Sequence, residues 1–242
     1  MHDYSYKPPP VFHGVGPLFL GVEIEVETPD SYEQECAEIA NEYLGDLGYL
    51  KQDGTIINGF EIVTHPMSYE WALANFPWHM LTELGQAGCE ATSNTGIHVH
   101  VARAALDSPC HIYRWMKLIY RNQPEVEMVA RRSAPDWAAF TADDRQAVKH
   151  YAKGIRGHDR YRAINTNNRD TFEVRVFASS LDPGEVKAAL AFTAGSVEYT
   201  RRLSIARLAA GAWEWPAFTA WLAEQPDYQP LTDQLEALAC AC

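Results

Sequence analysis

The sequence predicts an α+β fold, and three segments support this prediction. Apolar and polar residues alternate along residues 18–28, 97–103 and 171–177. Such alternation is typical of a strand that buries one face and exposes the other. Segments with apolar residues at helical spacing lie between these strands, so we expect a single α+β domain.

The bulk composition favours an ordinary globular protein. The chain has 242 residues, 47% hydrophobic and 21% charged, with a formal net charge of −12. We expect one domain with its core at residues 18–208 and a helical tail at 209–242. The acidic balance argues against a nucleic-acid partner, and no apolar run reaches membrane-spanning length. With no signal-peptide pattern and no zinc-type cysteine spacing, the sequence predicts a cytoplasmic protein with reduced thiols.

The first strand, residues 18–28, has apolar side chains at its even positions and glutamates at three odd positions. In a strand, this pattern makes one apolar face and one face of carboxylates, Glu23, Glu25 and Glu27. Three like charges in file repel one another, and no residue of the segment offsets them. A positively charged group is therefore expected over this face, with a solvated outer face as the simpler alternative.

The remaining elements follow from spacing and from turn residues. Another strand, residues 59–66, comes after an Asp53-Gly54 turn and ends at Pro66. Helices are predicted where apolar residues recur at helical spacing. They cover residues 29–48 with Gly48 as the cap, 68–88 with a break at Pro77, 111–123 up to Pro124, a further piece to 132, 182–208, and a last helix from 232.

Residue pairs common at helix starts support two of these boundaries. Ser108-Pro109 and Asp182-Pro183 each place a capping side chain before a proline, and Glu185 extends the second pair to a capping box. Residues 133–160, in contrast, are polar and irregular, with one short helix after Thr141. We interpret this segment as a mobile excursion over a site.

Each alternating strand carries ionisable side chains two residues apart on its polar face. The set comprises Glu23 and Glu25, His98 and His100, and Glu173 and Arg175, together with Glu61 in the strand 59–66. If the apolar faces share one core, all of these groups lie on the opposite face of one sheet. Four neighbouring carboxylates would have raised pKa values unless a cation balanced them.

Hard divalent cations such as Mg²⁺ or Mn²⁺ prefer carboxylate oxygens, and histidine can join them for Mn²⁺. An arginine at the edge suits phosphoryl transfer, in which metals and arginine neutralise phosphate charge. Taken singly, Glu-x-Glu is more often a solvated face and Glu-x-Arg a surface ion pair. Their occurrence in phase on apolar strands favours the metal site. No P-loop and no G-x-S-x-G motif occurs, so the sheet itself would hold a nucleotide.

Four motifs resemble, in their order, those of the glutamine synthetase-like carboxylate–amine ligases: GVEIEVE, DGT with GFEIVTHP, TGIHVHV, and RYRAINTNNRDTFEVRVF. The chain is most similar to the amidoligases of bacteria and their phages, over roughly residues 18–180. The resemblance implies a mainly antiparallel sheet curved into a funnel, with helices packed on its outer face. ATP and two or three Mg²⁺ or Mn²⁺ ions would bind the concave face.

The resemblance also implies roles for individual residues. His100 would face the nucleotide phosphates, and Arg175 would stabilise phosphoryl transfer. Arg162 and Asn165 fall where the family places polar groups near the phosphates or the substrate. The metal ligands would be Glu23, Glu25, Glu61, His98 and Glu173.

The reaction implied is ATP-dependent formation of an amide or isopeptide bond. A substrate carboxylate accepts the γ-phosphoryl group of ATP, and an amine, free or on a peptide or protein, then attacks the acyl phosphate. Arg175 and Arg162 would stabilise the moving charge, and residues 133–160 would shield the acyl phosphate from water. Arg160 and Arg169 are further candidates, with a solvated loop arginine as the alternative for either.

Three other functions fit the same residues. A guanidino-kinase-like phosphotransferase would pass the phosphate to a guanidinium nitrogen. A metal-dependent hydrolase would use the Glu/His cluster to activate water, and a binding protein would retain only a relic of the site. ADP release that requires an amine and a carboxylate together separates the ligase from these alternatives.

Overall fold

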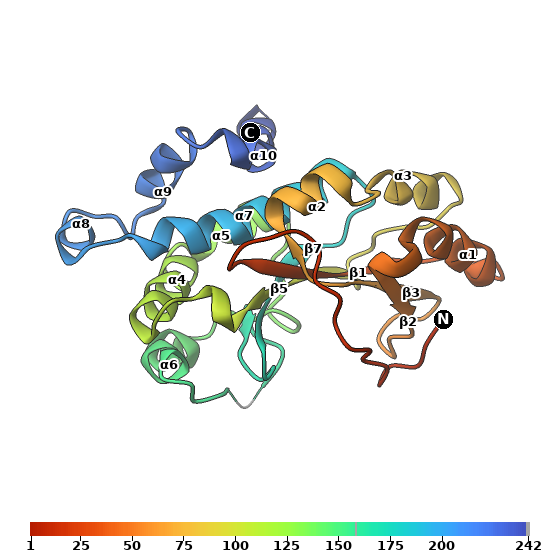
Figure 1. The fold of residues 1–242 in the computed structure, drawn as a ribbon, viewed down its shortest axis with the longest axis horizontal. Coiled ribbons are helices and arrows are strands. Elements are labelled where there is room, and N and C mark those ends of the chain that lie inside the picture. Colours follow the sequence, from red (N-terminus) through yellow and green to blue (C-terminus); the bar gives the residue numbers. More distant parts are fainter. Residues whose placement is uncertain (158, 241–242) are drawn as a thin grey trace.

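The computed structural model describes residues 1–157 and 159–240 (Figure 1). Within them, an antiparallel sheet of seven strands has the order β2–β3–β1–β5–β7–β6, with β4 beside the start of β1. The α+β class is therefore confirmed. The strands are β1 (Phe19–Glu27), β2 (Gly48–Lys51), β3 (Gly59–Thr64), β4 (Met67–Ser68), β5 (Gly96–Ala102), β6 (Ile164–Asn165) and β7 (Thr171–Ala178).

Helices cover the apolar face of this sheet. Figure 1 shows α2, α3 and α7 along one side of the strands. The helices are α1 (Glu33–Leu44), α2 (Tyr69–Asn75), α3 (His79–Gln86), α4 (Pro109–Arg121), α5 (Gln123–Ala130), α6 (Ala142–Ala152), α7 (Pro183–Arg201), α8 (Ile205–Ala209), α9 (Trp215–Leu222) and α10 (Gln229–Cys240). No helix in this described part of the chain has the length and apolar character needed to cross a membrane.

The alternation in β1 determines which face enters the core. Leu20, Ile24 and Val26 are fully buried, as the even positions predicted. At the other end of the sheet, Trp115 of α4 packs against Phe172 of β7 with ring centroids 5.7 Å apart. Burial of such large apolar side chains is the main favourable term in folding. It fixes the sheet so that the polar residues of each strand point away from the helices.

Several predicted helix boundaries are wrong, for local steric reasons. The first helix begins four residues later than predicted and ends before Gly45, which adopts a φ of 48° that glycine accepts at little cost. Gly48 begins β2 instead of capping the helix. Pro124 lies in the first turn of α5 instead of ending a helix, because a missing N–H costs nothing there. The last helix begins at Gln229, and residues 241 and 242 of the predicted tail lie outside the described residues.

The predicted helix 182–208 is two helices. The first of them, α7, ends at Arg201, and Ser204 then caps α8 by accepting a hydrogen bond from the N–H of Arg207 at 3.2 Å. Asp182 caps α7 as predicted. The capping box is wrong, because the Glu185 carboxylate is drawn away into an ion pair with Arg131 at 2.6 Å.

A buried histidine gives the folded chain a pH-dependent stability. Nε2 of His111 in α4 lies 2.9 Å from the carbonyl oxygen of Val197 in α7, and Nδ1 accepts a hydrogen bond from the Asp107 N–H at 3.2 Å. These partners require the neutral ring. Burial lowers the pKa of His111 below its ordinary value of 6.5.

The unfolded chain therefore takes up a proton that the folded protein excludes, and the free energy of unfolding falls as the pH drops below about 6.5. We expect urea denaturation at about pH 7.5 and about pH 5.5 to show a smaller loss of stability for His111→Gln than for the wild type. An equal loss in both proteins would contradict this account of His111.

Candidate functional site

Side chains of β1 face polar partners on both neighbouring strands. Glu23 pairs with His98 of β5, and Glu25 pairs with Glu61 of β3. Glu61 in turn pairs with Lys51 of β2. Directly paired residues of antiparallel strands share one face of the sheet. These five side chains therefore lie together on the face opposite the helices.

The same polar face continues across β7. Glu173 lies opposite His100 of β5 and Asn165 of β6. The β5–β7 register shifts beside His98, as in a β-bulge, which re-aims side chains locally. Arg175 consequently reaches this histidine, with Nη1 at 3.4 Å from its Nδ1.

These groups line a cavity of about 200 Å³ over the polar face. The structure brings to it all of the predicted site residues except Arg162: Glu23, Glu25, Glu61, His98, His100, Asn165, Glu173 and Arg175. The further candidate Arg160 also lines this cavity. Four separate strands thus place their ionisable side chains around one space, as the alternating patterns predicted.

His98 lies at the centre of the carboxylates. Its Nδ1 is 3.3 Å from Oε2 of Glu23 and 3.7 Å from Oε1 of Glu173. Its Nε2 is 3.7 Å from Oε1 of Glu25. Next to it, Nε2 of His100 is 3.1 Å from Oε1 of Glu23. The donor atoms are close enough to share small ions.

Hydrogen bonds hold two of the carboxylates in place. Oε2 of Glu25 accepts a hydrogen bond from the Gly96 N–H at 2.7 Å. Oε2 of Glu173 accepts from Nδ2 of Asn165 at 2.7 Å and from Nδ2 of Asn168 at 2.9 Å, and Arg175 donates to the other oxygen. Asn165 therefore orients Glu173. Such outer contacts are what fix the direction of a ligand side chain.

The pKa values of the carboxylates in the site are shifted in opposite directions. Burial, reinforced by Glu23, raises the pKa of Glu61 well above its usual range, and burial likewise raises the pKa of Glu25. Burial also opposes the charge on Glu23, but His100 and His98 outweigh it and hold the pKa of Glu23 well below its usual range. The carboxylate of Glu23 in return raises the pKa of His100 to about 9 against the effect of burial. Opposed shifts among neighbouring groups are typical of functional sites.

The donor atoms fit divalent cations. Three overlapping sets of ligand atoms each lie within 4.8 Å of one another: Glu23, Glu61 and His98; Glu23, His100 and Glu173; and Glu25, Asp53 and Glu61. Carboxylate oxygens with at most one imidazole per set suit Mg²⁺ or Mn²⁺. A scan of protein-family models found no match to this chain, and a search of curated proteins found no similar sequence.

Three cationic residues of the cavity, Lys7, Lys51 and Arg132, were missed by the sequence analysis. Lys51 places Nζ 2.9 Å from Oε2 of Glu61, and both side chains are buried. Arg132 follows α5, which ends in a left-handed turn at Arg131, and it lies so close to Gly96 that a Cβ there would be 2.5 Å from Nη1. Among the residues that the structure describes, Arg132 makes no ion pair with a carboxylate. Lys51, from β2, and Arg132, from the end of α5, both line the cavity.

The excursion 133–160 reaches the cavity from both of its ends. Trp137 and Arg160 line the cavity, as does the neighbouring Tyr161. Between them, α6 begins after Thr141 as predicted, because the Thr141 hydroxyl accepts a hydrogen bond from the Asp144 N–H at 3.1 Å. The segment therefore contributes an aromatic and basic rim to the site.

The structure does not bring Arg162 to the cavity. Its guanidinium instead contacts Asp144 of α6, with Nε at 3.5 Å from Oδ2, and Asp159, with Nη2 at 3.4 Å from Oδ2. A backbone bridge to Ala139 holds this stretch extended, so Tyr161 and Arg162 point to opposite sides. The candidate Arg169 is also absent from this cavity: its side chain is 85% exposed, lies 3.7 Å from Asp170 and lines the neighbouring second cavity.

We expect Arg162→Met to affect stability and not ligand binding at the cavity. Asp144 is buried and would lose its cationic partner, which should lower the free energy of unfolding by about 1–2 kcal/mol. Affinity for Mn²⁺ should not change. Urea denaturation and calorimetric titration with Mn²⁺ measure the two effects, and a loss of Mn²⁺ affinity without a loss of stability would reverse this placement of Arg162.

Proposed function

We propose that this protein is an ATP-dependent carboxylate–amine ligase of the amidoligase type, built on a glutamine synthetase-like fold. One observation carries the proposal. Carboxylates, imidazoles and an arginine from four strands gather on one wall of a cavity, and they occur in the chain order of that family's motifs. A curved antiparallel sheet with its helices on the outer face would present this wall as the inside of a funnel.

The residues that would hold Mg²⁺ or Mn²⁺ are Glu23, Glu25, Glu61, His98 and Glu173, with Asp53 and His100 next to them. When bound, such ions supply neutralisation of the phosphate charges of ATP. Lys51 and Arg175 already balance two of the carboxylates in this wall. The site thus combines fixed positive charges with oxygen ligands, as phosphoryl transfer needs.

The reaction would proceed in two steps. A carboxylate oxygen of the acid attacks the γ-phosphorus of ATP, the bond from that phosphorus to the β–γ bridging oxygen breaks, and ADP leaves. The amine nitrogen then attacks the acyl phosphate, loses a proton and releases inorganic phosphate as the amide forms. Arg175 would stabilise charge on the transferring phosphoryl group. The rim residues Trp137 and Tyr161 would keep water from the acyl phosphate.

Arg132 would anchor the acid substrate. Its guanidinium lies beside Gly96 in the cavity wall, and in the described residues it makes no ion pair with a carboxylate. A guanidinium in that state is suited to a bidentate contact with a carboxylate. The acid would thereby lie beside the ligands that bind the phosphates.

The test is ADP release from ATP with mixed pools of amines and carboxylic acids in the presence of Mg²⁺ or Mn²⁺. The ligase proposal expects release that needs an amine and an acid together, with an amide as product. Release with a guanidino compound alone would identify a phosphotransferase instead. Hydrolysis of a substrate without ATP would identify a metal-dependent hydrolase and contradict the proposal.

A further inference from the structure

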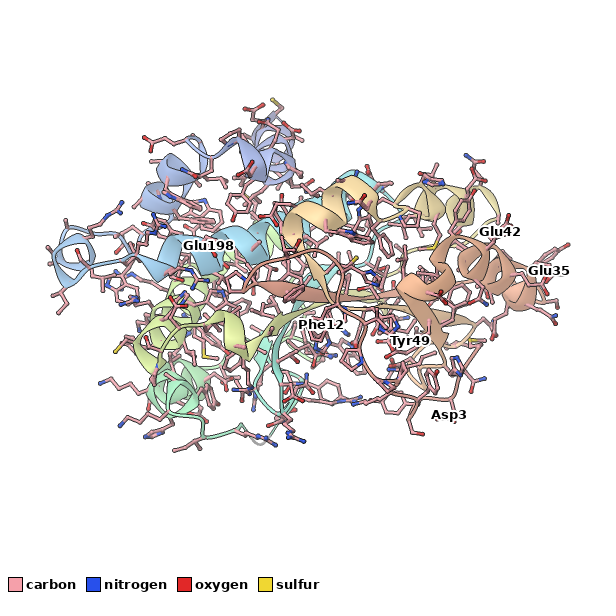
Figure 2. The ribbon with its side chains drawn as sticks, in the orientation of Figure 1. Asp3, Phe12, Glu35, Glu42, Tyr49 and Glu198 are labelled. Carbon is pink, nitrogen blue, oxygen red and sulfur yellow. The ribbon has the colours of Figure 1, made fainter. Side chains whose placement is uncertain are left out.

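The N-terminal residues 2–13 run across the polar side of the sheet (Figure 1). At one end, His2 pairs with β2: its N–H donates to the Leu50 carbonyl at 2.9 Å, and its carbonyl accepts from the Gln52 N–H at 3.0 Å. The His2 ring stacks on Tyr6 with centroids 3.6 Å apart, and Tyr6 meets the edge of Tyr49 at 5.2 Å. In Figure 2, Asp3 and Phe12 of this segment lie on either side of Tyr49. We refer to residues 2–13 as the strap.

The other end of the strap is fixed at β4. The His13 N–H donates to the Pro66 carbonyl, and the His13 carbonyl accepts from the Ser68 N–H, both at 2.9 Å. The His13 ring stacks on Trp71 at 4.8 Å. Gly14 has a φ of 85°, and a Cβ at this position would lie 2.3 Å from Oγ of Ser68, so only glycine fits here. This end is a tightly packed anchor.

Between its two ends, the strap contributes Tyr4 and Lys7 to the wall of the first cavity, and Tyr4 bonds to its rim. Tyr4 lines the cavity, and yet its side chain is half exposed, so it lies at the mouth. Its hydroxyl accepts a hydrogen bond from Arg160, which also donates to the Tyr161 hydroxyl at 3.0 Å. Nζ of Lys51 lies 5.2 Å from the centre of the Tyr4 ring. The Tyr4–Arg160 contact thus clasps the strap to the excursion 133–160.

The strap also forms one wall of a second cavity, which has a volume of about 460 Å³. Lys7, Pro8, Pro10 and Phe12 come from the strap, and Gly21 of β1 lies in the floor. The two cavities share five wall residues: Lys7, Glu23, Lys51, His100 and Asn168. A displacement of the strap would therefore open both spaces at once.

We propose that the strap is a gate, which releases at the Tyr4–Arg160 clasp and at the His2 pairing with β2, and turns about the His13–Gly14 anchor to admit ligands to both cavities. The clasp is a single contact between the half-exposed Tyr4 and the half-buried Arg160, whereas the anchor is hydrogen-bonded, stacked and sterically locked. The gate is a property of the folded chain and does not depend on which reaction the site performs.

A cysteine placed behind the strap reports on its opening. Gly21 has an ordinary extended backbone, and a Cβ there would be 3.6 Å from Cβ of His100, which is normal contact distance. Gly21→Cys therefore places a thiol in the floor of the second cavity without strain. The background carries Cys110→Ser, Cys240→Ser and Cys242→Ser, while Cys36 and Cys89 are buried. The rate of reaction with a maleimide is then measured without ATP or metal.

We expect Tyr4→Ala and Arg160→Ala each to raise the labelling rate on the order of tenfold, because either change removes the clasp. Tyr4→Phe, which loses only the hydroxyl, should give a smaller increase. Tyr32→Ala is the control, since Tyr32 is exposed and lies in neither cavity wall. Wild-type labelling rates in both clasp variants would overturn the gate, and so would an equal increase in Tyr32→Ala.

Hydrogen exchange distinguishes opening of the strap from a general loss of stability in a variant. In Tyr4→Ala, the amides of strap residues 3–7 should exchange faster, while the Ser68 amide at the anchor keeps its wild-type protection. Faster exchange of the Ser68 amide than in the wild type would contradict a strap that turns about the His13–Gly14 anchor. Neither measurement uses ATP, metal or substrates. A failed ligase assay would therefore contradict the proposed function without bearing on the gate.

Discussion

Glu23→Gln is expected to weaken Mn²⁺ binding at least about 100-fold. Glu23 supplies oxygens to two of the three ligand sets in the cavity, together with Glu61 and His98 in one and with His100 and Glu173 in the other. Because the histidines hold its pKa well below the usual range, Glu23 is charged at neutral pH. Glutamine keeps the shape of the side chain and removes this charge. Isothermal titration calorimetry with Mn²⁺ measures the change in affinity.

Glu27→Gln is the matched control for that experiment. Glu27 belongs to the same strand and the same alternating face, but it lies outside the wall of the cavity. Its replacement removes one negative charge without removing a ligand, so the Mn²⁺ affinity should stay close to that of the wild type. An equal loss in both variants would reduce the effect to net charge and contradict a defined metal site.

Arg175→Gln is expected to reduce ATP turnover by about 10²–10³-fold while leaving Mn²⁺ binding largely intact. The guanidinium donates to Glu173 and lies 3.4 Å from Nδ1 of His98, at the edge of the ligand cluster. From there it can meet a transferring phosphoryl group, and glutamine cannot supply the same charge. ADP release is measured with the amine and acid that support wild-type turnover.

Arg202→Gln is the control for Arg175, since this arginine is exposed and lies in the wall of neither cavity. Its turnover should match that of the wild type. Turnover in Arg175→Gln within threefold of the wild type, on the order of 0.6 kcal/mol in the barrier, would contradict a role in charge stabilisation.

The polar wall could be predicted from the sequence because strand alternation is a local property. The period of two assigns Glu23 and Glu25 to one face of β1, and the same rule applies to His98 and His100 in β5. Lys51 could not be placed in this way. The loop between β2 and β3 is longer than a two-residue hairpin turn, so the sequence does not fix the register that sets Lys51 opposite Glu61.

Long-range contacts account for the other differences. The backbone bridge to Ala139 directs Arg162 outward, and no local sequence pattern predicts this pairing. Arg132 reaches the cavity because α5 ends in a left-handed turn at Arg131. Tyr4 joins the rim only because the strap pairs with β2 and β4. Such placements depend on tertiary packing and not on the periodicity of the chain.

The most direct measurement is a crystal structure of the protein with Mn²⁺ and a non-hydrolysable ATP analogue, with anomalous scattering to locate the ions. The account predicts Mn²⁺ peaks within the cavity, ligated by carboxylate oxygens of Glu23 and Glu173 and by His98, with the phosphates of the analogue beside them. A cavity without ions at saturating Mn²⁺, or ions bound only elsewhere on the surface, would contradict it.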